Sequence, residues 1–176
     1  MLMLSFYLAL IDEEEQKEKF VILYERYRGL MLNVAYKYLN DRFLAEDAVH
    51  EAFLSVAKSM DKVGDVDSAE TRGLLLTVTR CCSVNLYHKF KGETPDDDTV
   101  KGKSEGEALS AENEFIAYTD AAELKKAVME LPPAYREPLL LRVAYGYSYK
   151  QIAKLLGISV ENGRKRVERA KKMLGL

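Results

Sequence analysis

Apolar residues recur at helical spacing along most of the chain, and the breaks between them mark the ends of predicted helices. The first stripe predicts a helix over residues 12–39, which begins with four acidic residues that favour a helix N-terminus. Asn40 and Asp41 interrupt the pattern, and a second helix is expected over residues 42–60. A short glycine-containing loop then leads to a third helix, expected over residues 68–90. Three closely connected amphipathic helices predict one compact bundle.

Two shorter helices with a tight turn between them are predicted over residues 146–174. Ser148 can cap the first helix, because Gln151 three residues later completes a capping box. Gly157 suits the end of this helix, because helices often end with a residue in the left-handed conformation and glycine adopts it at the lowest energetic cost. Ser159 suits the N-cap of the next helix. The inner face of the second helix is expected to consist of Val160, Val167, Ala170 and Leu174. Six cations occupy the same helix: Arg164, Lys165, Arg166, Arg169, Lys171 and Lys172.

A short helix, a glycine turn and a basic second helix are typical of a helix-turn-helix whose second helix enters the major groove of DNA. Helical hairpins with a merely solvated basic face share this pattern, so the spacing leaves both interpretations open. The agreement of caps, stripe and charge favours DNA binding.

Residues 92–114 differ from the rest of the chain, because they are acidic and have few apolar positions. This composition predicts a flexible linker. Beyond it, a helix is expected from about Ala111 or Asp120 to Leu131, and Pro132 and Pro133 start another over residues 134–144. No strand-like alternation, internal repeat or Gly-rich phosphate loop occurs in the sequence. It therefore predicts an all-α fold of two small helical domains, residues 1–91 and 115–176, joined by the linker.

The net charge of −2 hides a strong segregation of charge along the chain. Residues 72–91 carry four bases and no acid, and residues 132–176 carry ten bases and three acids. By contrast, residues 12–71 and residues 92–114 each have a net charge of −6. Two basic segments separated by acidic ones suit a protein that contacts DNA at two places.

Several other functions are disfavoured by the sequence. Cys81 and Cys82 are adjacent, with no further Cys or His at metal-ligand spacing, which predicts a reduced cytoplasmic protein with no disulfide framework and no metal site. His50 and His88 lie on different predicted helices without a nucleophile at a recognisable spacing, so neither an enzyme nor a cofactor is expected.

The apolar residues 1–11 are too few to span a bilayer and lack the basic leader and cleavage site of a signal peptide. We expect no membrane insertion. The segment is expected to pack on the first domain as a strand-like arm or a helix turn.

Four segments together resemble the extracytoplasmic-function (ECF) sigma factors, the smallest sigma-70-type subunits of bacterial RNA polymerase. The sequence at residues 131–142, LPPAYREPLLLR, is similar to the opening of the family's region 4, and YSYKQIAKLLGIS at residues 147–159 is similar to its helix-turn-helix. Residues 45–54, AEDAVHEAFL, resemble region 2.2, and residues 71–89 resemble regions 2.3 and 2.4. The helix-turn-helix alone occurs in many regulators, whereas both blocks in this order are highly specific.

The resemblance implies two partners, core RNA polymerase and promoter DNA, with an anti-sigma factor as a further possible partner. Region 2.2 of the family docks on the β′ clamp helices, and region 4 adjoins the β flap. Asp47, His50 and Glu51 occupy the docking position here, and their spacing puts them on one helix face.

The resemblance also implies two sets of DNA contacts. The set for the −10 element consists of Arg80, Cys81, Asn85, Tyr87, His88, Lys89 and Lys91. The set for the −35 element consists of Ser148, Lys150, Gln151, Ser159, Glu161, Asn162, Arg164, Lys165, Arg166 and Arg169. Glu161, Asn162, Lys165 and Arg166 would reach base edges, and Ser148, Lys150, Gln151, Arg164 and Arg169 would hold phosphates. Tyr87 and Phe90 would either stack on exposed bases or pack in the core.

Two positions depart from the family pattern. Gly163 stands where a β-branched core residue is usual, so either the recognition helix starts late or a neighbour packs close against it. Cys81 stands where many members have an asparagine that binds a flipped base, and a thiol cannot supply the same hydrogen bonds.

Two alternatives stay open beside the sigma factor: a helix-turn-helix regulator that works without polymerase, and a sigma-like protein that acts by binding an anti-sigma factor. The acidic docking position favours the sigma factor, because a self-sufficient regulator has no need of it.

Overall fold

The structure is a computed structural model that describes residues 2–92 and 122–176. Within these residues every regular element is a helix, which confirms the predicted all-α fold. Contacts divide the chain into two compact units, Met1–Tyr87 and His88–Leu176. None of the described helices is long and apolar enough to cross a membrane.

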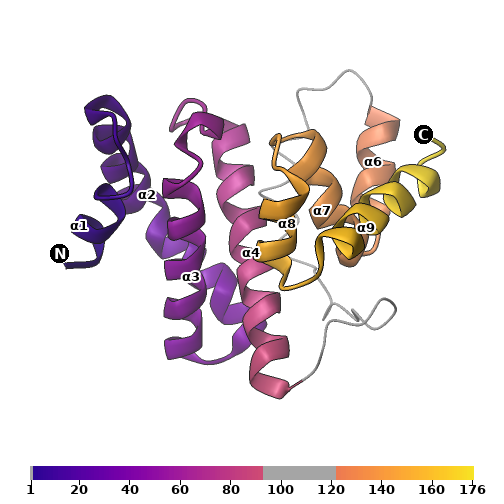
Figure 1. Cartoon of the computed structure of the whole chain (residues 1–176), viewed down its shortest axis with the longest axis horizontal. Coiled ribbons are helices and arrows are strands. Elements are labelled where there is room, and N and C mark those ends of the chain that lie inside the picture. The colour runs from indigo at the N-terminus through magenta and orange to yellow at the C-terminus, as the bar shows by residue number, and fades with distance from the viewer. Residues whose placement is uncertain (1, 93–121) are drawn as a thin grey trace. The chain divides into compact units, whose positions relative to one another are not determined.

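The first unit consists of helices that follow one another along the chain (Figure 1). Its elements are α1 (Leu2–Leu8), α2 (Glu14–Leu39), α3 (Arg42–Ala57), the 3₁₀ turn η1 (Met60–Lys62) and α4 (Ala69–Lys91), which continues beyond the unit boundary at Tyr87. Asn40 ends α2 in the left-handed region with φ 50°, and the Asp41 carboxylate caps α3 by accepting a hydrogen bond from the Leu44 amide at 3.0 Å. The predicted break at these two residues is confirmed.

The second predicted helix is shorter than expected. Helix α3 ends at Ala57, because Ser59 leaves the helical region with φ −137° and ψ 34°. Met60 is still buried, but it lies in η1 rather than in α3.

A cluster of aromatic rings joins α1, α2 and α3 in the core of the first unit. The Tyr7 ring lies 5.6 Å from Phe20, 5.9 Å from Tyr24 and 5.8 Å from Phe53, measured between centroids. The Tyr7 hydroxyl is 2.6 Å from Nδ1 of His50. Residues 2–8 therefore pack on the first domain as predicted, and of the two expected forms the helix is the one adopted.

The second unit is built around the face that α9 turns inward. Its described helices are α6 (Ala122–Glu130), α7 (Pro133–Val143), α8 (Tyr149–Leu156) and α9 (Val160–Met173). Leu131, Leu139, Val167 and Ala170 form its buried cluster. Pro133 is the first residue of α7, where its missing amide hydrogen costs nothing, so the predicted start at the proline pair is confirmed.

The predicted linker falls almost entirely outside the described residues. Helix α4 is followed by Gly92 with φ 66°, and residues 93–121 are not described. The domain boundaries at residues 91 and 115 therefore stay predictions.

The inner face of α9 differs from the prediction at one position. Val160 is 49% exposed, whereas Gly163 is buried. Side chains on a helix lean toward its N-terminus, so the side chain of the first residue points past the packed part of the helix. A Cβ atom at Gly163 would lie 3.8 Å from Cγ2 of Ile152 and 3.9 Å from Cδ1 of Ile158, which are ordinary contacts. Neither explanation offered for this glycine holds, because α9 already begins at Val160 and no neighbour is unusually close.

We expect Gly163→Ala to stabilise α9 by about 1 kcal/mol, because alanine favours a helix interior and its methyl group fits. Hydrogen exchange of the α9 amides should slow accordingly. Gly157→Ala is the matched control and should destabilise by about 1 kcal/mol, since Gly157 has φ 65°. Faster exchange in Gly163→Ala would contradict the prediction.

Tyr7 also predicts a pH dependence. Burial, with a smaller contribution from Tyr24, raises the pKa of the Tyr7 phenol from 10.0 to about 12. The raised pKa means that the folded state favours the neutral phenol. The contribution of Tyr7 to folding stability is therefore complete below pH 10 and is lost as the pH rises toward 12. We expect the free energy of unfolding to fall over this range and to fall less in Tyr7→Phe. Denaturation in urea at several pH values measures it.

The control is Tyr36→Phe, which replaces a half-exposed phenol of α2. Its free energy of unfolding should fall with pH as much as that of the wild type. An equal fall in Tyr7→Phe and in the wild type would show that Tyr7 is not the group responsible.

Candidate functional site

The turn between α8 and α9 has the cap chemistry that its sequence predicts. The Gln151 amide donates to Oγ of Ser148 at 3.3 Å, and the Ser148 amide donates to Oε1 of Gln151 at 2.9 Å, which completes the capping box. Gly157 ends α8 in the left-handed region, and Oγ of Ser159 accepts the Asn162 amide at 3.1 Å to cap α9. Two short helices joined in this way form a helix-turn-helix.

Arg142 also supports this motif, a role that was not predicted from the sequence. Its guanidinium donates to the Tyr147 carbonyl at 3.0 Å and lies 4.8 Å from the centroid of the Tyr149 ring. These contacts tie the end of α7 to the start of α8. Nothing in the spacing of one arginine distinguishes such a role from a solvated cation.

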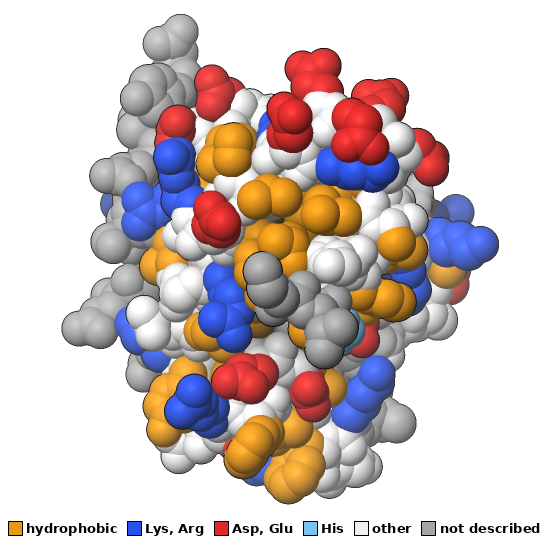
Figure 2. All heavy atoms as spheres, turned by 90° about the vertical axis from the view of Figure 1, so that its left-hand side faces the viewer, with side chains coloured by type: hydrophobic (Ala, Val, Ile, Leu, Met, Phe, Trp, Pro, Cys, Tyr) orange, Lys and Arg blue, Asp and Glu red, His pale blue; other side chains and the backbone are white. Residues whose placement is uncertain are grey.

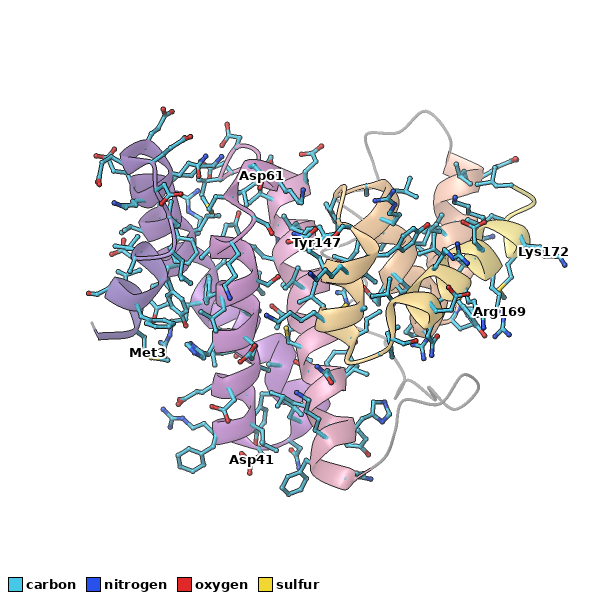
Figure 3. All side chains as sticks on the ribbon, viewed as in Figure 1. Met3, Asp41, Asp61, Tyr147, Arg169 and Lys172 are labelled. Atoms are coloured by element: carbon cyan, nitrogen blue, oxygen red, sulfur yellow. The ribbon has the colours of Figure 1, made fainter. Side chains whose placement is uncertain are left out.

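The outer face of α9 presents cations along its length. Lys165, Arg169 and Lys172 are exposed, and Figure 3 shows Arg169 and Lys172 extending away from the helix. The charges of two other cations of α9 are partly neutralised by acidic neighbours: Arg164 lies 3.1 Å from Glu161, and Lys171 lies 3.3 Å from Glu168. The exposed charge of α9 is therefore positive but modest.

Within the set expected to reach base edges, the structure separates two pairs of residues. Glu161 and Lys165 are exposed near the start of α9. Arg166 is only 3% exposed, and its Nε donates to Oδ1 of Asn162 at 3.0 Å. In this conformation Arg166 orients the Asn162 amide rather than reaching outward, and Glu161 and Lys165 are the exposed members of this set.

The phosphate set divides in a similar way. Lys150, Arg164 and Arg169 are exposed, whereas the side chains of Ser148 and Gln151 already take part in the capping box. Lys150, Arg164 and Arg169 are thus the members of the set whose positive charge can interact with a phosphate.

Helix α4 buries the first members of the −10 set and exposes the last. Arg80 is 2% exposed, with a guanidinium nitrogen 3.1 Å from Oγ1 of Thr77, and Cys81 is buried. This burial argues against the expected contact of Arg80 with a phosphate and of Cys81 with a base. The remaining residues become more exposed toward the end of the helix: Asn85, Tyr87 and His88 are half-buried, and Lys89 and Lys91 are exposed. Phe90 is 76% exposed, so core packing does not explain its ring.

Three side chains of α3 form a polar surface, which we call the α3 patch: Asp47, His50 and Glu51. Asp47 and Glu51 are exposed, and His50 is half-buried against α1. The hydrogen bond with Tyr7 engages Nδ1 of His50, so the ring is held in one orientation beside the two carboxylates. The sequence did not predict this role of Tyr7, because the two residues are 43 positions apart.

Within residues 2–92 and 122–176, no cluster of three or more His, Cys, Asp or Glu residues could hold a metal ion.

Two family models match the chain, in the order of the two units. The model described as Sigma-70 region 2 matches residues 23–87, and the model described as Sigma-70, region 4 matches residues 121–174. Together they cover about two thirds of the chain. The first range includes the α3 patch, and the second includes the helix-turn-helix.

Relatives of known family are similar to most of the chain. The probable ECF RNA polymerase sigma factor SigI of Mycobacterium tuberculosis (strain ATCC 25618 / H37Rv) is 28% identical over 153 residues, which are 84% of this chain and 51% of SigI. The ECF RNA polymerase sigma factor EcfG of Rhodopseudomonas palustris (strain TIE-1) is 28% identical over 130 residues, 74% of this chain and 68% of EcfG. SigM of Bacillus subtilis (strain 168), also an ECF RNA polymerase sigma factor, is 25% identical over 149 residues, 82% of this chain and 88% of SigM.

The chain spans about half the length of SigI, and most of the length of SigM. With regions 2 and 4 both present and in the family's order, this chain belongs to the extracytoplasmic-function group of the sigma-70 family.

Proposed function

We propose that this protein is a promoter-specificity subunit of RNA polymerase. It binds core polymerase in the cytoplasm, directs it to promoters through their −10 and −35 elements, and has no catalytic activity of its own. The observation that carries this proposal is the presence of sigma-70 regions 2 and 4 in one chain. A one-component regulator would need the helix-turn-helix but not region 2.

The α3 patch is the proposed docking site for the β′ clamp helices. Its two carboxylates are exposed and lie on one face of α3, where basic side chains of a partner can approach them. The fixed orientation of the His50 ring supports this role, because a pre-ordered side chain loses less entropy on binding.

Helix α9 is the proposed reader of the −35 element. A lysine near the start of a recognition helix suits the acceptors of guanine, and a glutamate suits the amino group of cytosine, so Lys165 and Glu161 are the proposed base contacts. Lys150, Arg164 and Arg169 are the proposed phosphate contacts, which set the position of the helix without reading sequence.

The exposed end of α4 is the proposed contact with the −10 element. Lys89 and Lys91 carry charge for phosphates, and the exposed Phe90 ring can stack on an unpaired base. Two weak DNA contacts held together by one polymerase raise each other's effective concentration, so neither has to bind tightly alone.

The first test of the proposed function is transcription by core RNA polymerase of the source organism, with and without this protein. We expect promoter-specific transcripts only when the protein is present. Glu51→Lys should weaken binding to core polymerase about tenfold or more, because it places a cation in an acidic docking surface. Titration of labelled protein with core polymerase measures the dissociation constant.

The matched control is Glu25→Lys, the same charge reversal at an exposed position of α2. It should bind core polymerase as the wild type does. Absence of transcripts combined with tight binding of the protein alone to duplex DNA would favour the helix-turn-helix regulator. Absence of both would favour a protein that acts by binding an anti-sigma factor.

Two lysines near the helix-turn-helix should differ in what they contribute. We expect Lys165→Ala to relax the preference at one position of the −35 element, since each good base contact discriminates by about 1–3 kcal/mol. Lys150→Ala should weaken all promoters alike, because a phosphate contact carries no sequence information. Transcription from a library with a randomised −35 element distinguishes the two patterns. Equal weakening of all sequences by Lys165→Ala would remove it from the base-reading set.

A further inference from the structure

We propose that two exposed phenyl rings, Phe43 on α3 and Phe6 on α1, flank the α3 patch and serve as apolar anchors for core RNA polymerase. The inference rests on the proposed docking function of α3, and it extends that surface onto a second helix. It would make α1 a part of the binding site.

Phe43 shares a helix face with the α3 patch. It precedes Asp47 by four residues, and at about 100° per residue Phe43, Asp47 and His50 fall within roughly 60° of one another around α3. Its side chain is 78% exposed although α3 has a well-filled inner face, on which Ala48, Ala52 and Phe53 are completely buried. A partner that covers Asp47 therefore also reaches Phe43.

Phe6 approaches the same patch from α1. Its ring centroid lies 6.4 Å from that of His50, and the residue is 54% exposed. The next residue, Tyr7, fixes α1 against α3 through its bond to His50 and its contact with Phe53. Phe6 therefore has a defined position beside the patch.

Further apolar surface continues along α1. Met3 precedes Phe6 by three residues, so the two share a face of α1, and Met3 is 46% exposed (Figure 3 labels it). Figure 2 shows the side of the first unit that carries α1, where apolar side chains gather at the centre and charged side chains of both signs lie around them. Apolar surface bordered by charge is typical of a protein-binding site.

The chemistry of the surface favours one kind of occupant, a helical surface of core polymerase with basic side chains between apolar ones. A second copy of this chain would bring Asp47 and Glu51 against like charges, and an anionic lipid surface would repel them in the same way. A basic and apolar partner would pair with the carboxylates and cover both rings. Aromatic residues supply much of the binding energy in such interfaces, whereas exposed charges mainly steer the encounter.

The test is binding of the full-length labelled protein to core RNA polymerase. We compare the wild type with Phe6→Ser, Phe43→Ser and the double variant, and each single change should weaken binding about tenfold. Ile22→Ser is the matched control: Ile22 is exposed on α2, about 200° around the helix from the buried Phe20, and its loss should leave binding unchanged. Thermal unfolding followed by circular dichroism should be the same for all five proteins, because the substituted side chains are exposed.

Glu51→Lys, measured in parallel, separates this inference from the proposed function. Loss of a phenyl ring should leave the salt dependence of binding as in the wild type, whereas Glu51→Lys should alter it. Weak binding by Glu51→Lys together with wild-type binding by both phenylalanine variants would overturn the inference and leave the docking site intact. Wild-type binding by every variant, Glu51→Lys included, would overturn the docking site and the inference together. If Phe6→Ser destabilises the packing of α1, the binding of Phe43→Ser, whose substitution lies on α3, decides the inference.

Discussion

The burial of one apolar stripe on each helix is the constraint on which both candidate surfaces depend. In α9, Val167 and Ala170 are completely buried beside Leu131 and Leu139, and this fixes the orientation of the helix about its axis. Lys165 then faces outward, because two residues correspond to about 200° of rotation. In α3 the same geometry turns Asp47 and Glu51 outward. Helices of this length are marginal in water on their own, so packing decides both their existence and the side chains that they present.

The features that could be predicted from the sequence are those decided within about four residues of chain. The capping box at Ser148 and Gln151, the left-handed Gly157 and the cap at Ser159 each depend on a contact between near neighbours, and all three are present. The break at Asn40 and Asp41 has the same local origin. The helices between these ends could be predicted from the periodic spacing of apolar residues, which is also local information.

The features that could not be predicted depend on residues far apart in the chain or on the route of a long side chain. Arginine can extend into solvent or lay its stem along apolar surface, and the sequence does not distinguish the two. Arg80 and Arg166 were expected at DNA and are buried, whereas Arg142 had no expected role and supports the start of α8. The contact between Tyr7 and His50 was equally beyond prediction, because only the packing of α1 brings them together.

On the proposed function, the distribution of charge explains how one chain can bind two partners of opposite charge. The α3 patch is acidic and the exposed face of α9 is basic, so each is suited to a partner that the other would repel. The ion pairs of Arg164 with Glu161 and of Lys171 with Glu168 leave α9 fewer unbalanced cations for phosphates. Salt-dependent affinity for DNA grows with the number of phosphates neutralised, so α9 alone should bind DNA weakly. On the proposed function this weakness is useful, because binding becomes strong only when core polymerase holds both DNA contacts at once.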